Sequence, residues 1–414
     1  MATTALDVLA AGHMSGVLDR SDLEADSFLF SYVAGCRAQD AVSLTMPVIR
    51  DPYDSMGSVH PIFEMNLPEG ALLEKLRARF AKTVPDFDGL ALLGIVGRSQ
   101  IGRLRYALAG QPPDEIAAEN LARILTYRGA GELFSDLLER YAAVSGISGT
   151  QPKVLVRADE PDLARATHRG ATHIVKSFDP REYPELAANE YFCLRAAGHA
   201  GLPTPRAQLA ENRRVLIVDR FDRRADGTYL GCEDFCVLSG LRAHGRYHGA
   251  YEDIAKRITQ FVSGERQRAA LAQLFTMVAL CCAVENGDAH LKNFAVLYEH
   301  PEGTVQLAPA YDIVATTPYD ARDVLALTLG GSKAFPDRAR LVDFGRRACS
   351  LSKRHVDEAL AQVRTGVERA CREIREHAAK HADFAAAGEQ LIATFERGVR
   401  RSMAVAQGFG SIGR

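Results

Sequence analysis

One segment of this 414-residue sequence carries the residue types that phosphoryl transfer requires. Residues 286–293 read Asn-Gly-Asp-Ala-His-Leu-Lys-Asn, and Asp312 follows downstream. A hydroxyl that accepts a phosphoryl group must give its proton to a base, and oxygen ligands must hold magnesium beside the phosphates. Asp288 and Asn293 have the separation at which kinases place the base and a metal-binding amide, before a second carboxylate. The spacing predicts Asp288 as the base, with Asn293 and Asp312 as magnesium ligands.

A loop rich in small residues and a separate lysine are suited to the phosphates of a nucleotide. Residues 145–153 read Ser-Gly-Ile-Ser-Gly-Thr-Gln-Pro-Lys. Small residues let backbone N–H groups approach phosphates closely, and the lysine adds positive charge. Lys176 lies in an apolar, strand-like run, and Glu190 in the following helical segment is its expected partner. Each segment alone also has a purely structural interpretation: the loop could be an ordinary turn, and Lys176 could be a surface lysine on an edge strand.

The hydrophobic pattern around these residues predicts an α+β chain with two lobes and an extra β-rich subdomain. Apolar runs with period two, broken by Gly and Asp, dominate the first hundred residues and include a candidate strand at 41–49. Strand-like runs then surround one helical segment at 184–205, and helical spacing dominates beyond residue 224. We therefore expect an N-terminal subdomain at 1–112, a lobe with the nucleotide loop at 113–224, and an all-helical lobe with the catalytic loop at 225–414.

Charge, cysteine content and hydrophobic runs indicate where in the cell the protein is expected and what it is not expected to bind. The 50 basic and 52 acidic residues give a net charge of -2, so no overall field favours nucleic acid or an anionic membrane. The eight cysteines form no C-x-x-C pair, which indicates buried, reduced thiols. No apolar run approaches the roughly 20 residues that cross a bilayer, and the N-terminus has no basic n-region. We expect a cytoplasmic protein that binds neither membrane nor, by itself, nucleic acid.

Seven segments resemble, in order, the motifs of HipA-like toxin kinases of type II toxin–antitoxin systems. They are GISGTQPKVLV, THIVKSF, NEYFCLRAAGHAGL, VDRFDRR, CEDFCVLSG, ENGDAHLKNFAVLY and PAYDIVAT. LTMPVIRDPYDSMGSVHPIFEMNLPEG is similar to the N-terminal subdomain of that family. The resemblance implies a protein-kinase-like fold and phosphorylation of a protein on serine or threonine with ATP and Mg2+. It also implies growth inhibition and a small DNA-binding antitoxin (HipB-like).

The resemblance also assigns roles to individual residues. It implies that Asp288, His290 and Lys176 are catalytic residues. It also implies that residues 219–221 form the hinge beside adenine. The nucleotide contacts are Ser148, Gly149, Thr150, Gln151, Lys153, Lys176, Asp219, Arg220, Phe221, His290, Asn293, Tyr311 and Asp312. The chain departs from the family at Gly146, where a regulatory serine is usual. Ser148 is therefore the candidate for autophosphorylation, with a structural hydrogen bond within the loop as the alternative.

Two other functions fit parts of the pattern. Small-molecule kinases such as aminoglycoside phosphotransferases use a similar Gly-Asp-x-x-x-x-Asn loop, so residues 287–293 alone do not name the acceptor. A pseudokinase that acts only within a repressor complex would share the fold. The presence of Lys176, Asp288, Asn293 and Asp312 argues against it, because a decayed site would have lost one of them.

Overall fold

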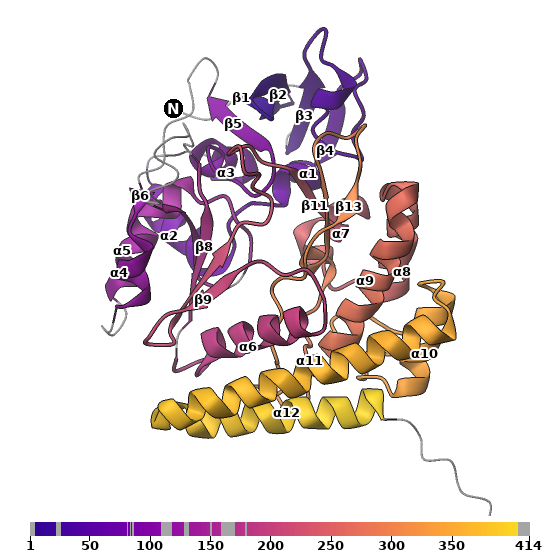
Figure 1. The fold of residues 1–414 in the computed structure, drawn as a ribbon. Coiled ribbons are helices and arrows are strands. Elements are labelled where there is room, and N and C mark those ends of the chain that lie inside the picture. Colours follow the sequence, from indigo (N-terminus) through magenta and orange to yellow (C-terminus); the bar gives the residue numbers. More distant parts are fainter. Residues whose placement is uncertain are drawn as a thin grey trace, which may run out of the picture.

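The computed structural model describes residues 5–21, 26–80, 82, 84, 87–108, 118–127, 132–149, 151–158, 170–178 and 180–404. Most strands lie in one half of the molecule, and the long helices α11 and α12 cross the other half (Figure 1). The mixed α+β class that the sequence predicts is confirmed. No helix in the described ranges has the length and apolar composition to cross a membrane.

The N-terminal sheet is antiparallel, with strand order β4-β3-β2-β1-β5. Every second residue of β1 is buried, as period-two patterning predicts. The strands are Ala5–Ala10 (β1), His13–Arg20 (β2), Ser27–Tyr32 (β3), Tyr53–Met56 (β4) and Leu104–Leu108 (β5). The helices of this part are Pro61–Glu64 (α1), Gly70–Phe80 (α2) and Gly89–Val96 (α3), with a 3-10 turn at Ala38–Asp40 (η1).

The strand expected at 41–49 does not form. Only an isolated bridge between Ser43 and Met46 occurs there. The polar groups of this segment bond instead to buried Glu233, which accepts from the Ser43 hydroxyl at 2.6 Å and from the Leu44 N–H at 2.8 Å. Pro47 also lacks the N–H that a ladder needs. The apolar run is buried without joining a sheet.

The second sheet has the order β6-β7-β8-β10-β9, and only the β6–β7 pair is parallel. Its strands are Ala118–Glu119 (β6), Lys153–Ala158 (β7), His173–Ser177 (β8), Ala207–Leu209 (β9) and Val215–Asp219 (β10). The helices of this part are Leu121–Leu125 (α4), Glu132–Tyr141 (α5) and Leu186–His199 (α6), with a 3-10 turn at Ala142–Val144 (η2). In the β7–β8 register Lys153 pairs with Lys176, so adjacent strands present these two residues side by side.

The C-terminal part is mainly helical. Its helices are Phe235–Leu238 (α7), Tyr251–Phe261 (α8), Gly264–Ala283 (α9), Arg338–Arg347 (α10), Lys353–Lys380 (α11) and Ala385–Met403 (α12). Three 3-10 turns join them, Ala243–Gly245 (η4), Leu291–Asn293 (η5) and Ala382–Phe384 (η6). Helix α11 has the helical spacing expected beyond residue 224, with Val356, Leu360, Val363, Val367, Cys371 and Ile374 all buried.

The expected all-helical lobe needs one correction, because it also contains a small antiparallel sheet, β11-β12-β13. The strands are Gly231–Asp234 (β11), Ala295–Tyr298 (β12) and Gln306–Leu307 (β13). All four residues of β12 are buried. A short strand that is buried on both faces has no alternation, so periodicity could not distinguish it from a helical segment.

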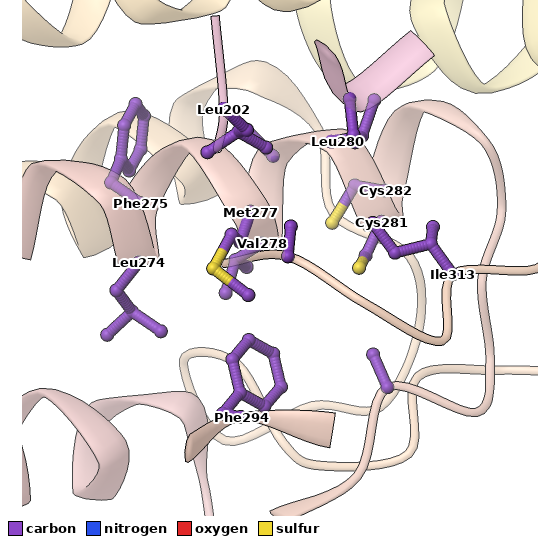
Figure 2. Packing of buried hydrophobic residues seen from close by; sticks show 14 of the residues in the cluster. Leu202, Leu274, Phe275, Met277, Val278, Leu280, Cys281, Cys282, Phe294 and Ile313 are labelled. Atoms are coloured by element: carbon purple, nitrogen blue, oxygen red, sulfur yellow. The ribbon is translucent and has the colours of Figure 1, made fainter. Parts of the chain in front are cut away.

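Two large hydrophobic cores hold the molecule. One joins the N-terminal sheet, its helices and much of the second sheet, and the other surrounds α9. Figure 2 shows Phe294 and Ile313 packed with the buried side chains of α9. These two residues directly follow Asn293 and Asp312, so the core fixes the backbone at both predicted magnesium ligands. The eight cysteines are free thiols, and all except Cys36 are buried, as expected.

Candidate active site

One cavity gathers most of the predicted site residues, which come from the lobe with the nucleotide loop and from the helical lobe. The predicted residues that line it are Ser148, Gly149, Gln151, Lys153, Lys176, Glu190, Phe221, Asp288, His290, Asn293, Tyr311 and Asp312. The nucleotide loop ends where β7 begins, and the catalytic loop runs from the end of α9 through η5. Thr150 lies outside the described residues.

Two buried lysines on adjacent strands place positive charge in the cavity. The Lys176 ammonium lies 2.5 Å from a carboxylate oxygen of Glu190 and 2.5 Å from one of Asp312. Burial alone would lower the pKa of Lys176, but these two carboxylates outweigh it and raise the pKa. Burial lowers the pKa of Lys153, its neighbour across the sheet. The expected pairing of Lys176 with Glu190 is confirmed.

Asn293 and Asp312 offer oxygen ligands suited to magnesium. Asn293 donates its side-chain N–H to the Asp288 carbonyl at 2.8 Å, which leaves the amide oxygen for a cation. Asp312 adopts a left-handed backbone, with φ of 54°, a conformation that costs a non-glycine residue energy and is common at functional sites. Although burial opposes it, Lys176 and Lys153 hold the pKa of Asp312 well below its usual range. A carboxylate with an amide oxygen is a donor set that magnesium accepts.

Asp288 has the surroundings of a base that is accessible to an acceptor. Its side chain is 43 % exposed, and Oδ1 accepts a hydrogen bond from the Tyr247 hydroxyl at 2.8 Å. Burial of the carboxylate in the cavity raises the pKa of Asp288 to about 6, although the hydrogen bond from Tyr247 acts in the opposite direction. A base with a pKa near 6 is mainly ionised at neutral pH and still binds a proton readily.

His290 faces the same cavity as a neutral ring. Burial lowers its pKa to about 4, so the imidazole is uncharged at neutral pH. Its Nε2 lies 4.0 Å from Asp288 Oδ1, and its ring packs edge-on against Tyr247 with 5.0 Å between centroids. The Nδ1 atom has no hydrogen-bond partner among the described residues. A neutral imidazole can donate to a phosphate oxygen without adding charge.

Of the three expected hinge residues, one side chain lines the cavity and two lie outside it. The Phe221 ring stacks on Tyr311 in the cavity at 5.1 Å between centroids. Asp219 instead lies 3.2 Å from His173, outside the cavity lining. Arg220 is buried in an ion pair with Asp222 at 2.6 Å. The side chains of Asp219 and Arg220 therefore do not line this cavity, and the expected place of residues 219–221 at a hinge beside adenine stays a prediction.

A buried carboxylate precedes the catalytic loop. Glu285, with φ of 55° and 1 % exposure, accepts a hydrogen bond from Thr317 at 2.6 Å. Arg397 and Arg401 of α12 form ion pairs with it at 2.5 and 2.8 Å. These contacts tie the C-terminal helix to the start of the loop that carries Asp288.

Several residues at the cavity were not predicted as site residues. Met65, Asn66, Arg246, Tyr247 and Lys292 all contribute to its lining. The segment LRAHGRYHG carried no site prediction, yet Arg246 and Tyr247, between its glycines, reach the site. The Pro-Glu-Gly sequence at 68–70 was interpreted only as a turn, although Glu69 contacts the nucleotide loop. A basic–aromatic pair flanked by glycines was the available signal for Arg246 and Tyr247.

Sequence comparison places the chain in a family. The profile of the HipA N-terminal domain matches residues 6–107, and that of the HipA-like C-terminal domain matches residues 145–371, more than half of the chain. The chain belongs to the HipA-like family. Two relatives of this HipA-like chain come from Sinorhizobium fredii and are described as "Putative kinase Y4mE" and "Putative kinase Y4dM". The first is 27 % identical, covering 70 % of this chain and 72 % of the relative, and the second is 28 % identical, covering 68 % of each.

A solved structure shares the fold. A chain in the HipA–HipB–operator DNA complex of the Shewanella oneidensis MR-1 toxin–antitoxin system superposes with a TM-score of 0.69. The two chains are 20 % identical, and the match covers 95 % of the HipA-like chain and 97 % of the other. The predicted two-lobed, kinase-like fold with an N-terminal subdomain is confirmed.

Proposed function

We propose that the HipA-like chain is an ATP- and magnesium-dependent serine/threonine protein kinase that inhibits growth. The observation that carries the proposal is the meeting of Lys176, Asp288, Asn293 and Asp312 in one cavity. These residues come from β8, the catalytic loop and the segment after β13, and their types are those that phosphoryl transfer needs. The names of the two Sinorhizobium fredii relatives also support a kinase.

In the proposed reaction Asp288 takes the proton of the acceptor hydroxyl. The acceptor oxygen then forms a bond to the γ-phosphorus of ATP while the bond from that phosphorus to the β–γ bridging oxygen breaks, and ADP leaves. Lys153 and Lys176 bind the phosphates, and neutral His290 donates to a phosphate oxygen. Asn293 and Asp312 would hold magnesium, which neutralises phosphate charge when it is bound.

Adenine has an apolar place in the same cavity. Ile174 and Val218 line it beside the Phe221–Tyr311 pair. Aromatic stacking and aliphatic contact suit a purine base. We assign the phosphates to Ser148, Gly149, Gln151 and the two lysines, and leave the Asp219 and Arg220 side chains out of the nucleotide contacts.

We propose the protein partner and the class of phosphate acceptor by analogy with the HipA-like family. The Shewanella oneidensis HipA was solved with HipB and operator DNA, which supports a small DNA-binding antitoxin for this chain. The match to the HipA N-terminal domain favours a protein acceptor over the small-molecule acceptor of an aminoglycoside phosphotransferase. We keep the three units at 1–112, 113–224 and 225–414, the cytoplasmic location and the lack of direct nucleic-acid binding as parts of this proposal.

Ser148 is the proposed site of autophosphorylation. Its hydroxyl donates to Glu69 at 2.5 Å. A phosphate there would remove this bond and place nearly two negative charges beside the carboxylate. The loop would then be expelled from the cavity, and nucleotide binding would be lost.

Phosphate transfer in a cell lysate tests the proposal. Purified protein is incubated with γ-labelled ATP, Mg2+ and lysate, and labelled proteins are identified together with their modified residues. We expect phosphoserine or phosphothreonine on a protein, and no label with Asp288→Asn, which keeps the fold and removes the base. Labelling that Asp288→Asn leaves unchanged would reject the assignment. Label that enters only small molecules would favour the small-molecule kinase.

A further inference from the structure

A carboxylate of the N-terminal subdomain joins two loops that meet at the cavity. Glu69 Oε1 accepts a hydrogen bond from the Ser148 hydroxyl of the nucleotide loop at 2.5 Å. Its Oε2 accepts from the Arg246 guanidinium of the helical lobe at 2.7 Å. Lys292, within the catalytic loop, lies 3.8 Å from Oε1. One side chain therefore contacts the nucleotide loop and the catalytic loop at the same time.

The surroundings of Glu69 keep it charged and oriented. Its side chain is only 19 % exposed, and burial by itself would raise its pKa. Lys292, Ser148 and Arg246 outweigh that effect and lower the pKa, so the group is ionised at neutral pH. Because its two oxygens bond to different segments, rotation of the carboxylate would break at least one contact.

The backbone before Glu69 strengthens the same connection. Lys292 donates to the Met65 carbonyl at 2.9 Å, and Asn66 donates to the Ile101 carbonyl at 2.8 Å. Met65 and Asn66 themselves line the cavity. Lys292 stands between Asp288 and Asn293 in the sequence, so the segment 65–69 contacts the loop that carries the base and a magnesium ligand.

We propose that Glu69 is a positioning residue that holds the nucleotide loop over the phosphates and couples its position to the catalytic loop. The inference rests on the proposed function for its consequence on ATP, but the contact itself is independent of catalysis. Gly149, next to Ser148, has a φ of 129°, a backbone conformation that L side chains rarely adopt. Hydrogen bonds of Ser145 and of the Gly146 N–H already fix the first residues of the loop. The Glu69 carboxylate adds a restraint farther along the loop, at Ser148.

Hydrogen exchange of the loop tests the contact without any catalytic readout. Glu69→Ala, Glu69→Gln, Ser148→Ala and the double variant Glu69→Ala/Ser148→Ala are compared without nucleotide, and exchange is followed in peptides that cover residues 145–153. We expect about tenfold faster exchange in Glu69→Ala and in Ser148→Ala, the size of one lost charge-assisted hydrogen bond. The double variant should be no faster than Glu69→Ala. Glu69→Gln should fall between the wild type and Glu69→Ala, because its amide oxygen still accepts from Ser148.

Glu64 offers a matched control in the same subdomain. Its carboxylate is also partly buried and accepts from the Ala243 N–H of the helical lobe at 3.0 Å, and it makes no hydrogen bond to the described residues of the nucleotide loop. Glu64→Gln should leave loop exchange at the wild-type rate. Equal loop exchange in Glu64→Gln and Glu69→Gln, or unchanged exchange in both Glu69→Ala and Ser148→Ala, would overturn the proposal.

Steady-state kinetics of the same variants links the contact to ATP. We expect KM for ATP to rise about tenfold in Glu69→Ala, with a smaller change in kcat and partial recovery in Glu69→Gln. A uniform loss of kcat with unchanged KM would contradict positioning of the nucleotide loop. If the wild type transfers no phosphate but loop exchange responds as expected, the proposed function fails and the contact stands. If the wild type is active and loop exchange does not respond, only the role of Glu69 fails.

Discussion

The Tyr247 hydroxyl donates a hydrogen bond to Asp288 Oδ1 at 2.8 Å, and the Tyr247 ring packs edge-on against His290. The bond occupies one carboxylate oxygen and leaves the other for the hydroxyl of an acceptor. It also favours the ionised carboxylate, against the effect of burial. Tyr247 is thus expected to hold the base in place and to keep it ionised.

Tyr247→Phe should move the acidic limb of the pH–rate profile upward. The pKa of Asp288 is about 6, and loss of a hydrogen bond that lowers it must raise it further. Because the base works only when ionised, the rate near pH 6 should fall several-fold and recover toward the wild-type value at pH 8. Initial rates of phosphate transfer across this range measure the effect. Tyr53→Phe, which removes an exposed hydroxyl bonded to the Pro47 carbonyl, is the control. An acidic limb that moves to lower pH in Tyr247→Phe would contradict the role of Tyr247.

Lys176→Met should reduce both ATP binding and stability. The change removes the cation that compensates the fully buried Glu190, and breaking such a pair costs about 3 kcal/mol or more. Adding Glu190→Gln should restore much of the thermal stability without restoring ATP binding. Melting curves and nucleotide titrations of the single and double variants separate the two effects. Wild-type ATP affinity in the double variant would show that Lys176 acts only in packing.

Gly146→Ala should disturb the nucleotide loop for steric reasons. A Cβ added at Gly146 would lie 2.5 Å from the Gln100 Cγ, while its N–H is held by the Ser99 carbonyl at 2.8 Å. Overpacking of this kind typically costs about 1–3 kcal/mol. Gln100→Ala combined with Gly146→Ala should recover most of the loss in melting temperature. An unperturbed single variant would mean that Gln100 moves aside freely, and the serine usual in this family could then be tolerated here.

Incubation with ATP and Mg2+ should place phosphate on Ser148. Mass spectrometry of the loop peptide measures it, and the Asp288→Asn form supplies the control that should remain unmodified. Modified protein should also bind ATP more weakly, because the phosphate would repel both Glu69 and the phosphates of ATP. A loop that stays unmodified after complete turnover of ATP would leave Ser148 with its hydrogen bond to Glu69 alone.

Residues that belong to a motif of fixed types and spacing could be predicted as site residues from the sequence. Asp288, Asn293 and Asp312 belong to a short pattern, and the structure brings them to one cavity. Tyr247 and Glu69 carry no such pattern, because their roles depend on contacts with residues 41 and 79 positions away. Asp219 and Arg220 were assigned to the hinge by resemblance, which does not specify where their side chains lie, and that assignment stays a prediction.

The fold was predictable to a similar degree. Helix α11 follows from its hydrophobic periodicity, and strand β10 from an unbroken run of mainly β-branched apolar residues; both are local properties of the sequence. The segment 41–49 looked like a strand because it is apolar, but its polar groups are bonded to Glu233, nearly two hundred residues later. Only the tertiary fold decides between these two uses of an apolar segment.

The ion pairs between Glu285 and α12 have a consequence for the order of events during synthesis. Arg397 lies 112 residues beyond Glu285, so the ribosome completes most of the helical lobe before this buried carboxylate meets its partners. Until α12 docks, Glu285 lacks both arginine partners, so the native conformation of the turn that leads into Asp288 is less favoured. We therefore expect this turn to reach its native conformation late in synthesis, and a chain truncated within α12 to hold the segment with Asp288 less firmly than the full chain does.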